Sequence, residues 1–219
     1  LRNANVAFLE GMAHIRLTAD RIPRFEEINE KLAPLTGWRY DAAAENAGIV
    51  DFMEALSRKV FLSSVDVRSW QELDFCKLPD IFHDVFGHAA MLTSPGFSRF
   101  LEELGKMCVR YKHNEEAVKC LSSVYWYTAE VGLIREGNEL KYYGGSIISS
   151  SKEIDTVYMD ASKKIRFDAG EVCAVPYNSY DVNSAYYVVE DLGELNASLA
   201  AIDQGLAAKV GGAPIMKQA

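Results

Sequence analysis

Hydrophobic residues recur every three or four positions over much of this chain, which is the pattern of amphipathic helices packed against a core. The clearest case is the segment 24–35, because Pro23 suits the first turn of a helix and Gly37 is placed to end it. Its apolar stripe consists of Phe25, Ile28, Leu32 and Leu35. The same pattern predicts further helices over residues 50–59, 95–111, 115–132 and 192–206.

Short strands are expected between these helices. Residues 60–68 are rich in β-branched side chains, and the run 186–189 is apolar, so both are predicted as strands. Gly137-Asn138 is typical of the tight turn of a hairpin whose strands would be 133–136 and 139–143.

Two segments have no clear period. Residues 38–48 are expected to form a loop, and residues 146–157 a serine-rich turn that passes into a helix. The prediction is a mainly α, single-domain fold with a few short strands over residues 1–206, followed by a flexible tail at 207–219.

Composition narrows the class of protein. The chain has 219 residues, 49% of them hydrophobic and 25% charged, which is ordinary for one globular domain with a substantial core. A net charge of −8 argues against nucleic-acid and anionic-membrane partners, since both attract basic surfaces. No apolar run is long enough to span a bilayer, and no signal peptide is evident. The first residue is Leu1 rather than Met, as expected of a truncated or naturally short N-terminus.

The four cysteines are widely spaced and include no Cys-x-x-Cys pair. A chain with a core of this size does not need disulfides, so four reduced thiols and a cytoplasmic location are expected. The cysteines are Cys76, Cys108, Cys120 and Cys173.

Two of the four histidines lie in the segment Pro79–His88. Five residues correspond to a rotation of about 140° on a regular helix, so His83 and His88 would converge only if the helix ended or distorted near Gly87. Two neutral imidazoles and one carboxylate make the facial triad that suits non-heme iron(II) and leaves positions open for O2. The alternative is one hydrogen-bonded core histidine and one histidine at a helix end.

Glu130 is the best candidate for the carboxylate. It lies near a predicted helix end among apolar residues, on the same face as Trp126. Burial of a lone carboxylate is costly unless it is paired or bound to a metal. The alternatives are that Glu130 reaches solvent, or that Asp80, Asp84 or Glu153 takes its place.

Four segments together resemble the family of tetrahydropterin-dependent aromatic amino acid hydroxylases, in particular its bacterial phenylalanine hydroxylases. They occur in the order of the family, within residues 8–195. The segments are Ile22–Arg39, Pro79–His88, Tyr125–Leu133 and Tyr143–Ser150.

This resemblance implies the helical basket of the family and a site for iron(II) formed by His83, His88 and Glu130. The chain would then be a monooxygenase that uses O2 and a tetrahydropterin to hydroxylate the ring of a free aromatic L-amino acid, with phenylalanine as the default. A monomer is expected, since the tetramer-forming tail of the family is not evident. The residues that match the substrate site are Arg68, Cys76, Pro79, Asp80, Trp126, Ser146 and Ser149, and those near the pterin are Phe52, Asp84, Ala47 and Gly48.

The chain departs from the family pattern mainly around the two organic ligands. Ala42–Gly48 replaces a Val-x-Gly-Leu-like run, Asp84 a glutamate, and Cys76 a threonine. Ser146 replaces a glycine against which the substrate ring packs in the family, and Val131 replaces a phenylalanine beside the iron ligand. These changes keep two alternatives open: meta-hydroxylation of phenylalanine or hydroxylation of tryptophan, and a pterin-independent iron oxygenase. Two further alternatives are a non-catalytic binding protein on the same fold and a zinc hydrolase, since two histidines and a glutamate also suit catalytic zinc.

Overall fold

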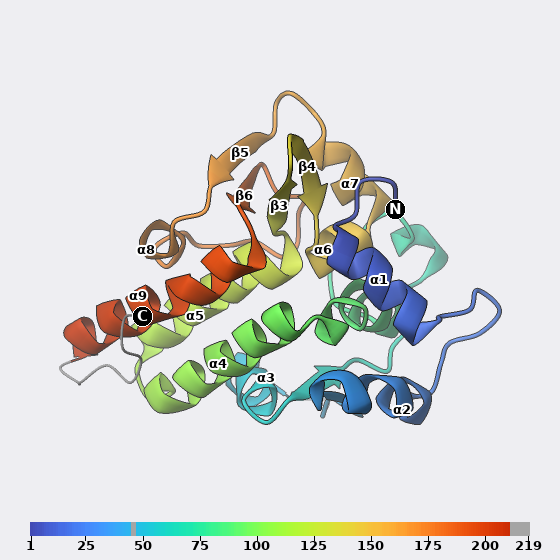
Figure 1. Cartoon of the computed structure of the whole chain (residues 1–219), viewed down its shortest axis with the longest axis horizontal. Coiled ribbons are helices and arrows are strands. Elements are labelled where there is room, and N and C mark those ends of the chain that lie inside the picture. Colours follow the sequence, from blue (N-terminus) through green and yellow to red (C-terminus); the bar gives the residue numbers. More distant parts are fainter. Residues whose placement is uncertain (45–46, 211–219) are drawn as a thin grey trace.

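The structure, a computed structural model, describes residues 1–44 and 47–210. The fold is mainly helical with a few short strands, as the hydrophobic pattern predicts (Figure 1). The α-helices are α1 (Val6–Ile15), α2 (Phe25–Thr36), α3 (Ile49–Leu56), α4 (Pro95–Tyr111), α5 (Glu115–Tyr125), α6 (Gly145–Ile148), α7 (Ser151–Val157), α8 (Ala169–Val172) and α9 (Leu192–Val210). The strands are β1 (Arg39–Ala42), β2 (Val60–Ser63), β3 (Leu133–Glu136), β4 (Glu139–Tyr142), β5 (Lys163–Arg166) and β6 (Ala185–Val189).

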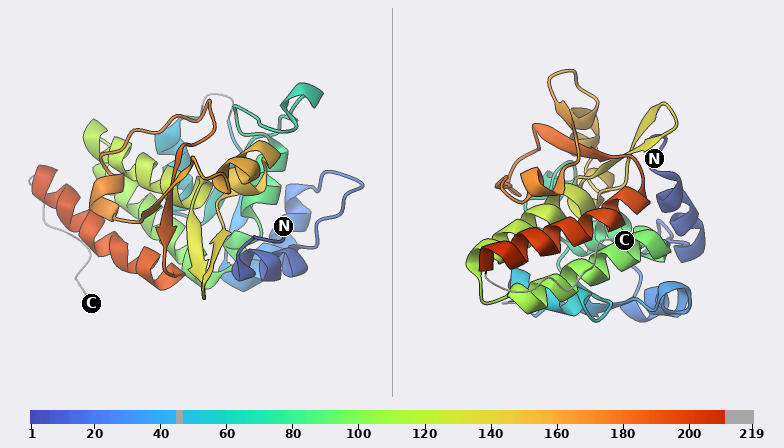
Figure 2. Two further views of the ribbon diagram at one scale, coloured as in Figure 1. Left: turned by 90° about the horizontal axis from the view of Figure 1, so that it is seen from above. Right: turned by 60° about the vertical axis from the view of Figure 1, so that its left-hand side comes forward.

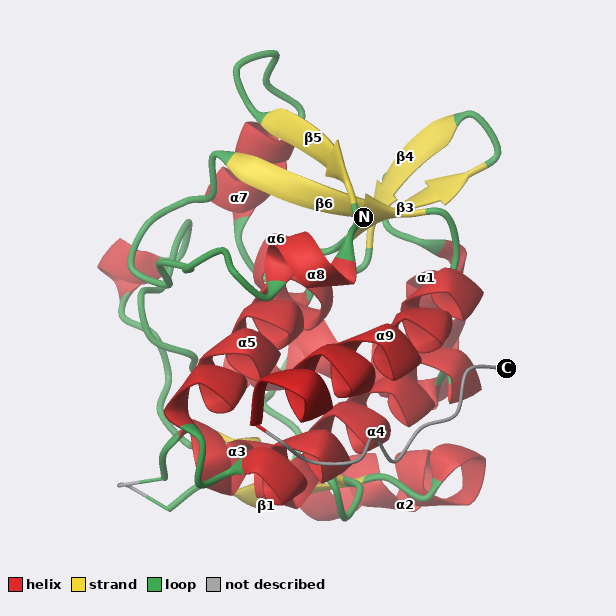
Figure 3. Ribbon diagram, turned by 90° about the vertical axis from the view of Figure 1, so that its left-hand side faces the viewer, coloured by secondary structure: helices red, strands yellow, loops and turns green. Residues whose placement is uncertain are grey.

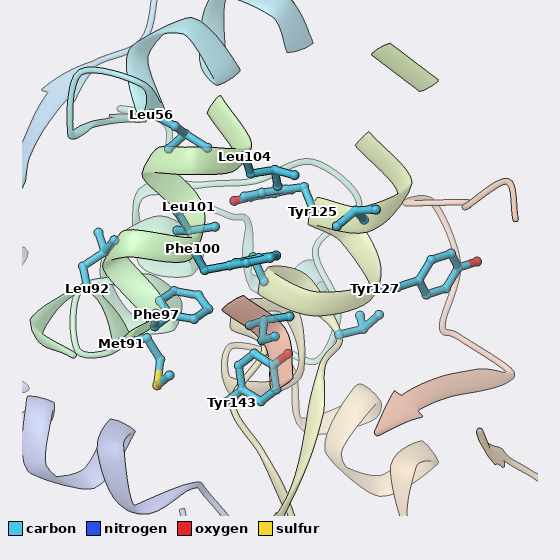
Figure 4. Close-up of a cluster of buried hydrophobic side chains, with 14 of the residues drawn as sticks. Leu56, Met91, Leu92, Phe97, Phe100, Leu101, Leu104, Tyr125, Tyr127 and Tyr143 are labelled. Carbon is cyan, nitrogen blue, oxygen red and sulfur yellow. The ribbon is translucent and has the colours of Figure 1, made fainter. Parts of the chain in front are cut away.

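The long helices form the centre of the molecule. Helix α4 packs against α3, α5 and α9. Its inward face is apolar, and Phe97, Phe100 and Leu104 are fully buried in it. Figure 4 shows these side chains between α4 and the helix that carries Tyr125. This packed core holds α5 in place, and α5 leads directly into the segment that carries Glu130.

Two small sheets lie on opposite sides of the helices (Figure 2, Figure 3). The larger has the order β4-β3-β6-β5, with β3 and β4 antiparallel and the other neighbours parallel. The predicted hairpin is confirmed, and Gly137 adopts the positive φ of 59° that its turn requires. The smaller sheet pairs β1 with β2 in parallel, with Tyr40 opposite Phe61.

Several predicted boundaries were wrong. The predicted loop at 38–48 contains β1, and the predicted strand at 60–68 ends at Ser63 because only its first four residues pair with β1. Helices α1 and α8 and strand β5 were not predicted. Helix α9 continues to Val210, beyond the predicted end at 206, and the rest of the predicted tail lies outside the described residues.

The expectation of four reduced thiols is also contradicted. Cys120 on α5 and Cys173, just after α8, form a disulfide across 53 residues of sequence. The two helices pack against each other, and this tertiary contact brings together cysteines whose spacing suggested no pairing. Cys76 and Cys108 are free. Within residues 1–44 and 47–210, no helix combines the length and apolar character required to cross a membrane.

Candidate active site

The segment His83–His88 is a π-helix, the distortion that the histidine spacing requires. Hydrogen bonds from residue i to i+5 widen the turn, so residues five apart come to lie on one face. The Nε2 atoms of His83 and His88 are therefore only 3.3 Å apart. Gly87 contributes close packing, because a Cβ atom there would lie 2.7 Å from the Gly145 carbonyl oxygen.

Glu130 is also presented by a π-helix. The segment Trp126–Glu130 continues α5, and the Val131 amide donates to the Trp126 carbonyl five residues earlier, at 3.0 Å. This turns the Glu130 carboxylate towards the histidines. Its Oε2 lies 3.3 Å from His83 Nε2, and its Oε1 lies 3.3 Å from His88 Nε2.

The three side chains form a buried candidate metal site. The His83 Nδ1 atom lies 2.8 Å from the Ser149 hydroxyl, which itself donates to the Gly145 carbonyl at 2.8 Å. Since that hydroxyl proton is already used, Ser149 accepts a hydrogen bond from Nδ1–H of His83. The Nε2 lone pair of His83 is then free for a metal, as in other histidine sites where the second nitrogen is held.

The charges around Glu130 keep its carboxyl group ionised. Burial alone would raise the pKa of its carboxyl, but the adjacent His88 and His83 outweigh burial and hold that pKa well below its usual range. Burial would lower the pKa of His83, whereas the charge of Glu130 raises it above its usual value. Glu130 therefore stays ionised, and a divalent cation that binds here would displace the proton that the raised pKa favours on His83.

The turn around α6 contacts all three of these side chains. Gly144 packs against the Glu130 backbone, where a Cβ atom would lie 2.3 Å from the carbonyl oxygen. Gly145 packs against the His88 ring, and Ser146 Oγ donates to Glu130 Oε2 at 2.8 Å. Together with Ser149, this places four positions of one short turn against the candidate ligands.

The rival acids are engaged elsewhere. Asp80 pairs with Arg68, and Glu153 accepts hydrogen bonds from Asn183 and Tyr186 through Oε1. Asp84 lies 3.9 Å from His83 Nε2, but its other oxygen accepts from the Ser64 amide at 2.7 Å. Burial raises the pKa of the Asp84 carboxyl. These contacts leave Glu130 as the carboxylate that faces both histidines.

A cavity of about 750 Å³ opens in front of this site. Its volume lies within the range of small-molecule sites, about 300–1,000 Å³. With the exceptions of His88 and Asp80, which lie behind the surface of the cavity, every residue expected in the site lines it. These are His83, Glu130, Phe52, Asp84, Ala47, Gly48, Arg68, Cys76, Pro79, Trp126, Ser146 and Ser149.

Arg68 and Asp80 form a buried ion pair at one wall of the cavity. Two nitrogens of the guanidinium donate to the two carboxylate oxygens, at 2.7 and 3.1 Å, and a third donates to the Ser149 carbonyl at 2.9 Å. Burial would raise the pKa of Asp80, but hydrogen bonds from Arg68 and from the His83 amide lower it. This network holds the guanidinium rigidly, and it joins Arg68 to the segment that carries His83.

Aromatic side chains form two other walls. Trp126 stacks on Tyr177, with ring centroids 5.0 Å apart, and its indole nitrogen donates to Asn183 Oδ1. Phe52 is held edge-on by Phe61 and Tyr125, each with a centroid separation of 5.3 Å. Sequence reasoning missed Tyr177 and Asn183, because both lie in a stretch without a periodic pattern.

Comparison with known proteins agrees with this arrangement. The model of the family described as biopterin-dependent aromatic amino acid hydroxylases matches residues 3–209. The phenylalanine-4-hydroxylase of Vibrio cholerae is 35% identical over 192 residues, which cover 86% of this chain and 65% of that protein. The phenylalanine-4-hydroxylase of Pseudomonas aeruginosa is 34% identical over 190 residues, covering 86% of this chain and 71% of the relative.

The fold is shared with a solved relative. A crystal structure of phenylalanine hydroxylase from Chromobacterium violaceum, with bound iron(III) and 7,8-dihydrobiopterin, superposes with a TM-score of 0.86 at 33% identity. The match covers 95% of this chain and 76% of that one. The chain thus spans about two thirds to three quarters of the length of these relatives, and the predicted fold class is confirmed. The chain belongs to the family of biopterin-dependent aromatic amino acid hydroxylases.

Proposed function

We propose that this chain is an iron(II)- and tetrahydropterin-dependent monooxygenase that hydroxylates the ring of a free aromatic L-amino acid, with phenylalanine as the substrate. The observation that carries the proposal is the convergence of His83, His88 and Glu130 at the cavity. Membership of the family and the iron and dihydrobiopterin bound by the Chromobacterium relative support the choice of cofactors.

The donor set suits iron(II). Two imidazoles and one ionised carboxylate leave open positions for exogenous ligands, which a hydroxylase needs. Ser149 directs the Nε2 lone pair of His83 towards the site, and the buried negative charge of Glu130 is compensated when a cation binds. When bound, iron(II) and the tetrahydropterin supply the electrons that activate O2. The same donors also bind zinc, so metal analysis of the purified protein is the first control.

Arg68 is the proposed group for the substrate carboxylate. Its guanidinium can bind both oxygens of a carboxylate, and Asp80 orients it by a two-point contact. The aromatic ring would lie beside Trp126 and Pro79, with Cys76, Ser146 and Ser149 completing the pocket. Fixing the carboxylate in this way orients the aromatic ring relative to the metal.

The wall that carries Phe52 is the proposed pterin side. Phe52 presents an aromatic surface against which a pterin ring can stack, and Asp84, Ala47 and Gly48 line the same cavity. Glu45 and Asn46, in the altered loop, lie outside the described residues. A titration of the protein with reduced pterin tests this part of the proposal separately from turnover.

Turnover tests the proposal as a whole. The protein is loaded anaerobically with iron(II) and supplied with tetrahydropterin, O2 and either phenylalanine, tyrosine or tryptophan, and hydroxylated products are separated by position. We expect hydroxylated phenylalanine to form only when both cofactors are present. Iron-loaded protein that converts none of the three amino acids would contradict the proposal.

A second candidate concerns the position of hydroxylation. Ser146 lines the cavity and contacts the carboxylate of Glu130, so it alters the space beside the candidate metal ligand. Buried Val131 follows Glu130 directly, where a larger ring is expected from the family pattern. Hydroxylation of phenylalanine at the meta position, or of tryptophan, would be detected in the same product analysis.

We also propose that the chain acts as a monomer in the cytoplasm. Cytosolic reductants keep most thiols reduced, so the Cys120–Cys173 disulfide would be an exception among proteins of this compartment. Fractionation of cells tests the location, and sedimentation of the purified chain tests the monomer. Recovery of the chain outside the cytosolic fraction, or a stable dimer, would contradict the respective proposal.

A further inference from the structure

Ser146 makes a contact with the candidate metal site that differs from those of the other cavity residues. Each oxygen of the Glu130 carboxylate lies 3.3 Å from the Nε2 atom of one histidine, Oε2 from His83 and Oε1 from His88, and the Ser146 hydroxyl donates to Oε2 in addition, at 2.8 Å. Ser146 is half-buried at the start of α6, and Glu130 is buried. The two oxygens of the carboxylate therefore have different surroundings before any metal binds.

A glutamate side chain needs such a contact to have a defined orientation. The terminal torsion of glutamate is broad, so a carboxylate can rotate between binding with one oxygen and binding with two. A hydrogen bond to a charged oxygen is stronger than one between neutral groups, and it occupies a lone pair of that oxygen. The Ser146 contact thus restricts rotation and makes Oε2 the weaker donor.

We propose that Ser146 is a positioning residue that directs Glu130 to bind the metal through Oε1 alone. The inference rests on the proposed metal site at His83, His88 and Glu130. A carboxylate that binds through one oxygen leaves one more coordination position for exogenous ligands than a carboxylate that binds through two. Ser146 therefore helps to set how many positions remain open at the metal.

The turn that carries Ser146 is also held against the metal site by its neighbours. Gly145, the preceding residue, contacts the His88 ring, and Ser149 contacts His83 on the same turn. The backbone around Ser146 is consequently held by two other contacts to the site. Removal of its hydroxyl should alter the Glu130 carboxylate without displacing the turn itself.

The test uses Co(II), whose visible absorption reports the number and arrangement of its ligands. Ser146→Ala and Ser146→Gly both remove the hydroxyl, and they differ in the space that they leave. We expect both variants to bind Co(II) about 10–100-fold more weakly than the unsubstituted protein, which is the usual effect of removing a residue that hydrogen-bonds to a metal ligand. We also expect both to show the same altered absorption spectrum.

Ser122→Ala is the matched control. Ser122 also lines the cavity, but its hydroxyl donates to the Val118 carbonyl within its own helix, so the spectrum of bound Co(II) should not change. If the Ser146 variants bind Co(II) with the spectrum and affinity of the unsubstituted protein, the role of Ser146 is refuted and the metal site stands. If the unsubstituted protein binds no Co(II) or iron(II), both proposals are refuted.

Discussion

The close approach of Gly145 to His88 leads to a sharp prediction for Gly145→Ala. The added Cβ atom would lie 2.4 Å from both Cε1 and Nε2 of the imidazole. Ordinary contact begins at 3.4 Å, so the ring and the turn must separate by about 1 Å. The ring has little room, because His88 is only 1% exposed and the centroid of the Phe61 ring lies 4.9 Å from that of the imidazole.

Two effects of different size are expected from this displacement. Overpacking of a buried site costs about 1–3 kcal/mol of unfolding free energy. Removal of a residue that hydrogen-bonds to a metal ligand typically weakens metal binding ~10–100-fold. Movement of the His88 Nε2 atom by about 1 Å should weaken metal binding by at least as much. Urea denaturation of the metal-free protein measures the first effect, and anaerobic titration with Co(II) measures the second.

Gly205→Ala is the control for adding a methyl group to a glycine. Gly205 lies within α9, and a Cβ atom there would have no neighbour within 4 Å. We expect this variant to gain about 0.4–1 kcal/mol of stability, because alanine restricts the unfolded chain, and to bind metal normally. A Gly145→Ala protein that binds Co(II) as tightly as the control would refute the idea that this contact positions His88.

Three further predictions follow from the buried groups. Asp80→Ala leaves the guanidinium of Arg68 buried without its partner, and we expect a loss of about 3–5 kcal/mol in unfolding free energy by urea denaturation; a loss typical of a surface ion pair would contradict this. Burial raises the pKa of the Cys108 thiol to about 11, so that at pH 8 only about one molecule in a thousand carries the reactive thiolate. Alkylation of native Cys108, followed by mass spectrometry, should therefore be far slower than in the denatured protein and should accelerate as the pH rises, and equal rates would show that the thiol is accessible and ionised. Iron(II) should raise the thermal midpoint of the protein, since a ligand present at 100 times its dissociation constant stabilises the folded state by about 2.7 kcal/mol, and a chelator should reverse the shift; an unchanged midpoint would argue against a metal site.

The sequence allowed much of the helical framework to be predicted, because long amphipathic segments carry their own signal. Helices α2 and α4 lie close to their predicted positions, and Gly37 ends α2 as expected. The need for a distorted helix between His83 and His88 was also predictable, since a regular helix would separate them. The form of the distortion, a π-helix that packs against α6, could not be predicted from the sequence.

The elements that were missed depend on tertiary contacts. Strand β1 is four residues long and mostly exposed, and it exists because it pairs with β2. Strand β5 has the sequence Lys-Lys-Ile-Arg, in which no apolar alternation is visible, and it is defined by its pairing with β6. The Cys120–Cys173 disulfide likewise depends on the packing of α5 with α8.

Within the site, residue types were easier to predict than contacts. The resemblance of the sequence to a family indicated which side chains to expect, and all of them except His88 and Asp80 line the cavity. The hydrogen bond from Ser146 to Glu130 and the stacking of Tyr177 on Trp126 join residues far apart in the chain. No local pattern encodes such pairs, because they result from the way the whole fold closes.

The turn around α6 has a consequence for how this centre can be modified. Gly144, Gly145, Ser146 and Ser149 each touch a different part of the donor set: the Glu130 backbone, the His88 ring, the Glu130 carboxylate and the His83 ring. The hydroxyls of Ser146 and Ser149 can therefore be changed singly, whereas Gly144 and Gly145 leave no room for a larger side chain. Chemical tuning of the centre, by evolution or by engineering, can proceed one donor at a time without rebuilding the helices that support it.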